Sequence, residues 1–213
     1  MFCLPQDGAT PLCLACQNGH TDVVLLLLDR GARPNQLCGN GRTALLLASQ
    51  FGREDCVRLL LMAGAAVDMA GPGGGTPLSV ASARGHRKEV QLLLEAGAAV
   101  NKATCGGVTP LLFASQNGHK SIVKLLLRAG ASVSLATNGG TTPILIACQR
   151  GHEEIVKQLL DGGASVHAAS KDGETPLLQA STHGHYSTVK LLIERGADPS
   201  VTNKVSAIAT ANK

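Results

Sequence analysis

The chain has 213 residues, of which 44% are apolar, only 2% are aromatic, and none is tryptophan. This composition allows a sizeable core, which must be built from leucine, valine and alanine rather than from rings. The formal net charge of +4 is too small an excess to indicate nucleic acid as a partner, and no apolar run approaches the roughly 20 residues that span a bilayer, so we expect no membrane insertion.

The first predicted element begins at a threonine that returns with a fixed period along the chain. This threonine is followed by proline or alanine, and glycine stands two residues before it and nine residues after it. Six copies keep the same phase, which excludes coincidence and marks an internal repeat. The threonines are Thr10, Thr43, Thr76, Thr109, Thr142 and Thr175.

Each repeat predicts two short helices and a turn. In the fourth copy Thr109 caps a first helix through its hydroxyl, and Pro110 fits the first helical position, where no N–H is needed. Gly118 permits a left-handed turn, a second amphipathic helix follows, and Gly130 ends it before a glycine-containing turn or hairpin. Two helices of this length cannot bury their apolar faces alone. The sequence therefore predicts an all-α fold, an elongated and curved solenoid of stacked helix pairs without separate domains.

The repeated motifs "TPLxxA", "GH", "VxxLL" and "GA" resemble the ankyrin repeat family, from Gly8 to about Lys204. The resemblance implies helix-turn-helix units joined by β-turn or hairpin loops, in a single array over residues 1–213. The expected repeats are 5–37, 38–70, 71–103, 104–136, 137–169 and 170–202, with a partial seventh at 203–213. The chain departs from the family where histidine usually follows the proline by two residues, which suggests a more apolar packing between units. That position holds Cys13, Leu46, Ser79, Leu112, Leu145 and Leu178.

The stretch "DMAGPGGGTPL", Asp68 to Leu78, superficially resembles a phosphate-binding loop, since glycines precede a helix start. Gly74, however, is the glycine that precedes every repeat threonine, and no lysine follows at the position such loops require. We therefore expect the tip of a turn rather than a nucleotide site.

The seven cysteines, at positions 3, 13, 16, 38, 56, 105 and 148, have no framework spacing. This favours free thiols and an intracellular location, cytoplasmic or nuclear. "CLAC", Cys13 to Cys16, matches half of a redox or zinc motif, but Cys16 occupies a column of small residues and no second pair exists. We interpret it as packing.

Histidine recurs in phase directly after the mid-repeat glycine. Consecutive copies stand about 10 Å apart in a helical stack and cannot converge on one metal. We expect these rings to cap the turn before the second helix, with Arg53 replacing one of them. The histidines are His20, His86, His119, His152 and His185.

Two positions at the end of each first helix are not dictated by the repeat, and by resemblance to the family they lie on the concave face. Amides, arginines and one aromatic ring there suit a peptide backbone and acidic side chains, with Phe51 and Arg84 as candidate hot spots. Ordinary solvated helix ends are an equally weighted alternative. Together with Arg42 at a turn tip, the predicted partner-binding residues are Gln50, Phe51, Arg84, Gln116, Asn117, Gln149, Arg150 and His183.

No catalytic, cofactor-binding or metal-binding residue is predicted, and we expect no enzyme activity. The function that the resemblance implies is a scaffold that binds another protein through the concave groove and turn tips. The alternative is the targeting or substrate-recognition part of a larger enzyme, channel or ubiquitin-ligase adaptor. Neither end of the array carries a polar capping repeat, so we expect further repeats or another chain to cover them. The alternative is that frayed ends are simply tolerated.

Overall fold

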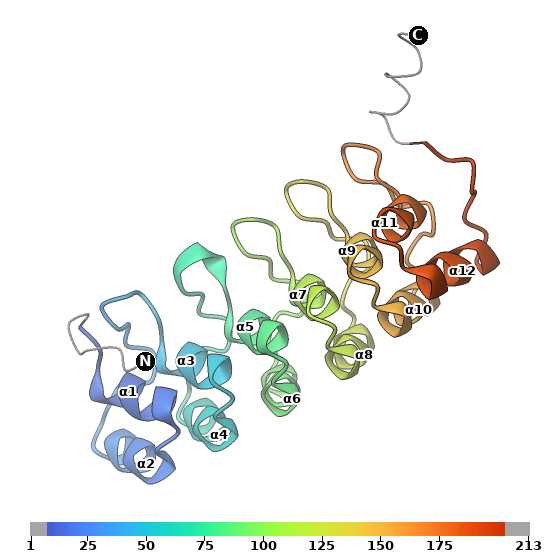
Figure 1. Ribbon diagram of the computed structural model, residues 1–213. Helices are drawn as coiled ribbons and strands as arrows, with labels where there is room; N and C mark the ends of the chain where they lie inside the picture. The colour runs from blue at the N-terminus through green and yellow to red at the C-terminus, as the bar shows by residue number, and fades with distance from the viewer. Residues whose placement is uncertain (1–7, 203–213) are drawn as a thin grey trace. The chain divides into compact units, whose positions relative to one another are not determined.

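The computed structural model describes residues 8–202, within which every regular element is helical (Figure 1). The chain divides into two compact units, which meet in sequence at Cys105 and Gly106. Unit 1 contains α1 (Pro11–Asn18), α2 (Thr21–Asp29), α3 (Ala44–Gln50), α4 (Glu54–Met62), the short 3₁₀ turn η1 (Pro72–Gly74), α5 (Pro77–Arg84) and α6 (Arg87–Glu95). Unit 2 contains α7 (Pro110–Gln116), α8 (Lys120–Arg128), α9 (Pro143–Arg150), α10 (Glu153–Asp161), α11 (Pro176–Thr182) and α12 (Tyr186–Glu194).

Five of the six helix pairs within residues 8–202 begin with the threonine cap that the sequence predicts. The hydroxyl oxygen of Thr76 accepts a hydrogen bond from the backbone N–H of Ser79 at 3.2 Å, and Pro77 opens α5. The same threonine cap starts α1, α3, α7 and α11, whereas the Thr142 hydroxyl makes no such bond at α9. The first turn of a helix has unsatisfied N–H groups, so a threonine in extended conformation fixes where the helix starts.

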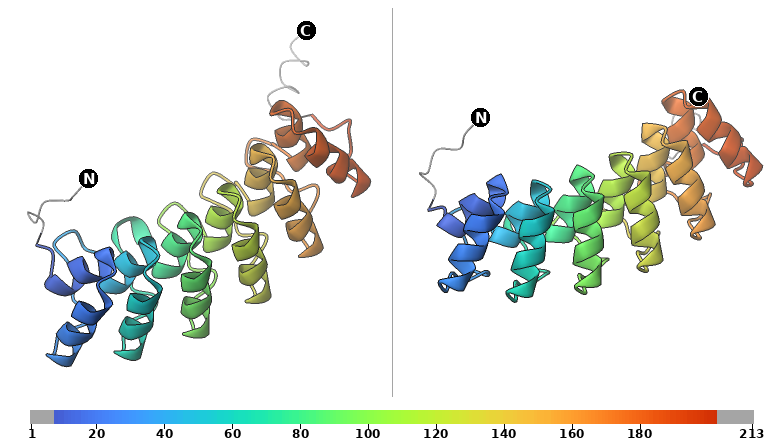
Figure 2. Two further views of the ribbon diagram at one scale, coloured as in Figure 1. Left: turned by 60° about the horizontal axis from the view of Figure 1, so that its bottom comes forward. Right: turned by 90° about the horizontal axis from the view of Figure 1, so that it is seen from below.

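The helix pairs of each unit form two layers. In unit 1 the first helices α1, α3 and α5 pack side by side, and α2, α4 and α6 form a second row against them (Figures 1 and 2). In unit 2, α7, α9 and α11 form the first row, and α8, α10 and α12 form the second. The all-α class of stacked helix pairs is therefore confirmed. The partial seventh repeat falls on residues 203–213, outside the described residues, and the proposed repeat boundaries stay a prediction.

The core consists of small aliphatic side chains at the repeat positions. Leu60, Leu93, Leu126 and Leu159 occupy the same position of successive second helices and are completely buried. At another shared position, Val23 of the first pair is 46% exposed whereas Cys56 of the second pair is 1% exposed, since among the described residues no helix pair packs on that side of α2. Burial at this position therefore comes from the neighbouring repeat and not from the helix itself.

The turn histidines bind the preceding repeat. Nε2 of His86 donates to the carbonyl oxygen of Gln50 at 3.1 Å, and Nε2 of His185 donates to that of Gln149 at 3.0 Å. His152 bonds Gln116 in the same way. The interpretation of these rings as caps of their own second helix is wrong, because none of them makes a side-chain cap bond. The carbonyl at the end of a first helix has no intrahelical partner, and the ring of the next repeat satisfies it.

Gly151 combines a left-handed backbone with close contact to that ring. Its φ is +70°, and a Cβ added there would lie 2.5 Å from Nδ1 of His185. Gly163 has φ +90° with no atom within 4 Å of an added Cβ. Backbone strain is thus common to both positions, whereas a steric clash arises only at Gly151.

We expect Gly163→Ala to lower the free energy of unfolding by about 1–2 kcal/mol, the cost of a left-handed non-glycine residue. Gly151→Ala should cost at least about 1 kcal/mol more, because the added methyl displaces the His185 ring. Urea unfolding followed by circular dichroism measures both values. Equal losses of unfolding free energy for the two variants would show that the clash with the His185 ring adds no measurable cost at Gly151.

Candidate functional site

The structure brings four of the predicted binding residues of unit 1 together, and we call them the unit-1 surface: Arg42, Gln50, Phe51 and Arg84. α3 ends at Gln50, Phe51 follows as its C-cap, and Arg84 is the last residue of α5. Phe51 is 40% exposed, and Arg84 is also exposed. Because α3 and α5 are packed neighbours, Phe51 and Arg84 lie at corresponding ends of adjacent helices.

Arg42 joins this surface from the hairpin before α3. The backbone N–H of Cys38 donates to the carbonyl oxygen of Arg42 at 2.8 Å, which closes the hairpin. Nη1 of Arg42 lies 3.5 Å from Oε1 of Gln50 and donates to it. The half-buried Arg42 side chain therefore connects the hairpin to the end of α3.

A disulfide links Cys13 of α1 to Cys38 at the base of the same hairpin. The expectation of free thiols is therefore wrong for this pair. The two residues are 25 positions apart, and only the stacking of the second hairpin against α1 brings them together. Nothing in the cysteine spacing could have indicated this pairing. The disulfide joins the hairpin that carries Arg42 to the first repeat.

The predicted residues of unit 2 form a second group, the unit-2 surface, at the ends of α7, α9 and α11: Gln116, Asn117, Gln149, Arg150 and His183. Nδ1 of His183 donates to the carbonyl oxygen of Gln179 at 2.9 Å, and its ring stacks on His185 at a centroid distance of 6.1 Å. Gln149 lines a small polar hollow with Asp172 and Glu174 of the following hairpin. This group thus has carboxylates beside it, whereas the described residues around the unit-1 surface supply none.

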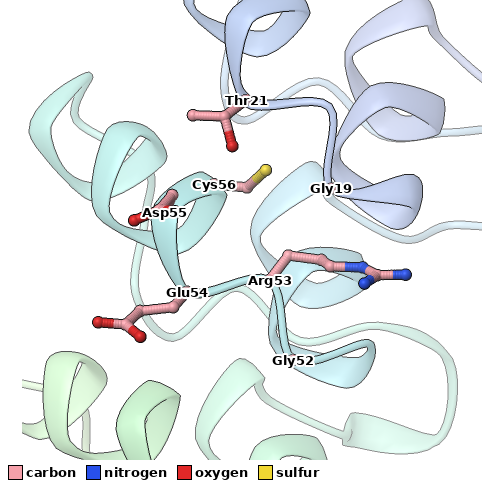
Figure 3. Close-up of a pocket in the computed structure, with 7 residues that line it drawn as sticks. All are labelled: Gly19, Thr21, Gly52, Arg53, Glu54, Asp55 and Cys56. Carbon is pink, nitrogen blue, oxygen red and sulfur yellow. The ribbon is translucent and has the colours of Figure 1, made fainter.

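A further polar hollow, which the sequence did not indicate, lies where α2 and α4 begin (Figure 3). Arg53 runs toward Gly19, and its Nε donates to the carbonyl oxygen of Gln17 at 3.1 Å, as the histidines do elsewhere. The volume of about 250 Å³ is below the roughly 300–1,000 Å³ typical of small-molecule pockets. The one available sequence signal was that Arg53 stands where the other repeats have histidine. This signal indicates packing between repeats.

The thiols beside this hollow are poor nucleophiles. Burial raises the pKa of Cys16 to about 12, and the neighbouring Cys56 contributes to that rise. Burial also raises the pKa of Cys56. Thiolate is the reactive form, so both side chains remain protonated at neutral pH. Cys16 of "CLAC" thus belongs to the core, and its sequence neighbour Cys13 bonds elsewhere.

The glycine-rich stretch before α5 is a hairpin tip. The N–H of Gly71 donates to the carbonyl oxygen of Gly75 at 2.9 Å, and the N–H of Gly74 donates to that of Gly71 at 3.0 Å. The next hairpin bonds to it, since the N–H of Cys105 donates to the carbonyl oxygen of Gly73. A phosphate-binding loop needs its amides directed at the ligand, whereas these amides bond within the hairpin.

Residues 8–202 contain no group of three or more histidine, cysteine, aspartate or glutamate side chains placed to hold a metal ion. Within the same range, no helix is both long enough and apolar enough to cross a membrane.

Helix pairs that stack through identical positions, joined by hairpins, define a helical repeat protein. The family model described as ankyrin repeats (3 copies) matches residues 2–71, 64–137 and 130–203. These matches cover nearly the whole chain, so it belongs to the ankyrin repeat family, whose repeats generally mediate protein–protein interaction and are typically non-catalytic. No curated protein matches the chain.

Reduction of the Cys13–Cys38 disulfide should lower the stability of unit 1 by about 2–4 kcal/mol, because the bond restricts the unfolded chain. Cys13→Ser combined with Cys38→Ser should show the same loss and no further response to reductant. These serines match Ser79 and Ser170 of other repeats, so each is a residue that the fold already accepts. Urea unfolding with and without reductant measures the effect. Alkylation of both thiols in the native, unreduced protein would contradict the pairing.

Stability should also fall at alkaline pH through Cys148. An exposed thiol titrates near 9.0, whereas burial raises the pKa of Cys148 to about 12. Between these values the unfolded chain releases a proton that the folded chain keeps, so the contribution of this thiol is complete below 9.0 and is lost as the pH rises toward 12.

Cys148→Ser should reduce this alkaline loss, by up to about 1 kcal/mol per pH unit. Serine occupies the same column at Ser49, Ser82 and Ser115, which makes it the matched replacement. Urea unfolding of parent and variant, from neutral pH to about pH 11, gives the difference. A difference that does not change with pH would show that Cys148 does not titrate as described.

Proposed function

We propose that the chain is a non-catalytic scaffold that binds another protein through the exposed ends of its first helices and the adjoining hairpin tips. The observation that carries this proposal is the exposure of Phe51 beside Arg84 at corresponding ends of packed helices. Neither position is needed by the fold, since asparagine stands there in other repeats, at Asn18 and Asn117. An exposed ring and a neighbouring guanidinium are the side chains that most often dominate protein interfaces.

The unit-2 surface supports the same function with different chemistry. It consists of amides, Arg150 and His183, which suit hydrogen bonds to a peptide backbone or to polar side chains. We propose that it contributes contacts of its own to the partner. Such a complex needs no cofactor, because its affinity comes from a few well-placed side chains.

The cellular location belongs to this proposal as well. An intracellular site, cytoplasmic or nuclear, was expected from the cysteine pattern, but the Cys13–Cys38 disulfide weighs against a strongly reducing compartment. Binding experiments are therefore best made both with and without reductant.

A second candidate is that the chain is the targeting or substrate-recognition part of a larger protein, such as an enzyme, channel or ubiquitin-ligase adaptor. It is favoured by the apolar face of α2, where Val23 is exposed although the corresponding Cys56 is buried, and where Leu26 is exposed as well. A further ankyrin-type repeat or another chain would cover this face. Adjoining coding sequence for such repeats in the same transcript would support this candidate. A transcript without it, together with a monodisperse monomer in solution, would oppose it.

Replacing Phe51 and Arg84 by asparagine should abolish capture of the partner from cell lysate, because truncated hot spots each cost about 1–2 kcal/mol or more. The control carries Met62→Ala and Arg87→Ala, which remove an exposed apolar and an exposed basic side chain from the second-helix layer of the same unit. Quantitative mass spectrometry compares the captured proteins, and circular dichroism checks the helicity of each variant. A partner retained equally by all three proteins would place the binding site elsewhere.

A further inference from the structure

The carboxylates of unit 1 are separated from its first helices. Among residues 8–105, α1, α3 and α5 contain no acidic residue, and the hairpins contain only Asp68. Both carboxylate oxygens of Asp68 accept from the backbone N–H of Ala99 at 3.1 Å, so that charge is engaged at the base of a hairpin. Asp7 lies outside the described residues. The other acidic residues all belong to second helices, namely Asp22, Asp29, Glu54, Asp55, Glu89 and Glu95.

The basic residues of the unit-1 surface have no such internal partner. Within residues 8–202, neither Arg42 nor Arg84 takes part in a salt bridge, and the one side-chain hydrogen bond of Arg42 goes to the neutral amide of Gln50. Two of the three basic residues on the second helices of unit 1 differ, since Arg58 and Lys88 both pair with Glu54, at 3.2 and 2.8 Å. Two guanidinium groups without a counter-charge make this surface a site of positive potential.

Phe51 gives the same surface an apolar element. Its ring is 40% exposed next to Gln50, whose carbonyl oxygen is bonded to His86. The backbone at the end of α3 is therefore fixed by the next repeat, and the ring stands on a rigid support. An apolar side chain of a partner can bury area against a ring held in this way.

We propose that the unit-1 surface recognises an acidic segment of the partner protein, in which aspartate or glutamate residues flank one apolar anchor. This inference rests on the proposed scaffold function and adds the chemistry of the partner. The carboxylates bind Arg84 and Arg42, for which the guanidinium fork offers paired hydrogen bonds. The anchor packs on Phe51, and its position between the charges sets the register of the segment.

Unit 2 provides the matched control within the same chain. Arg150 ends α9 as Arg84 ends α5, so the two arginines hold the same position in their repeats. Gln149 directly precedes Arg150 and lines a hollow with Asp172 and Glu174. A segment rich in carboxylates is repelled there by charges of its own sign, so Arg150 does not contribute as Arg84 does.

The test measures fluorescence anisotropy of the full-length, unreduced protein with a fluorescein-labelled peptide of glutamates around a central leucine. Control peptides carry glutamine for every glutamate or alanine for the leucine, and labelled oligothymidine tests for a general preference for anions. We expect the acidic peptide to bind at least about tenfold more tightly than its glutamine counterpart, with an affinity that falls as salt is added.

Each variant takes the residue that another repeat carries at that position. Arg84→Asn and Arg42→Thr should each weaken the binding of the acidic peptide by about three- to tenfold, the range of a single solvent-exposed hydrogen bond. Arg150→Asn should change the affinity for this peptide by less than about twofold, because Arg150 belongs to the unit-2 surface, which contacts other parts of the partner. Phe51→Asn should remove the preference for leucine over alanine.

The acidic specificity would be overturned by equal binding of the glutamate and glutamine peptides or by no binding of the glutamate peptide. An equal effect of Arg84→Asn and Arg150→Asn would overturn it as well. Tighter binding of oligothymidine than of the peptide would replace it with a nucleic-acid site. The capture experiment distinguishes these failures from failure of the scaffold function. A partner lost by the Phe51 and Arg84 variant without any peptide selectivity leaves the scaffold function standing and refutes only the acidic segment.

Discussion

The structure depends on one constraint, which is that a single helix pair cannot bury its own apolar faces. Each pair leaves a row of aliphatic side chains on its flank, and these become buried only when the next pair stacks against them. Val23 and Cys56, which hold the same position in successive repeats, differ in burial for this reason. Polar groups follow the same rule, since the carbonyl oxygen of Gln50 has no partner in its own helix and is bonded by His86 of the following repeat.

The same stacking decides where the side chains available for binding are found. The buried faces of both helix rows are committed to contacts between repeats. The hairpins also bond to one another, as Cys105 does to Gly73. The ends of the first helices are less constrained, so different side chains can stand there without disturbing the fold. Phe51, Arg84 and Arg150 occupy such positions, and the stack places the first two on neighbouring helices of unit 1.

The cysteines show how far local sequence can mislead in a repeat protein. Cys13 and Cys16 are close in sequence and suggest a joint role, yet Cys13 bonds Cys38 of the next repeat and Cys16 lies next to Cys56 in the core. Both contacts cross from one repeat to the following one. Burial in turn raises the pKa of Cys16, which makes its thiol part of the packing rather than a reactive group.

The sequence by itself determined the helix starts, the turn glycines and the aliphatic core positions, because threonine caps, left-handed glycines and helical periodicity act over a few residues. It also singled out Phe51 and Arg84 as residues that the repeat does not require. Only the tertiary structure decided the partners of the turn side chains, the pairing of Cys13 with Cys38, and the separation of charge between the two helix layers of unit 1. Each of these depends on which side chains of one repeat meet the next, and spacing along the chain does not specify that.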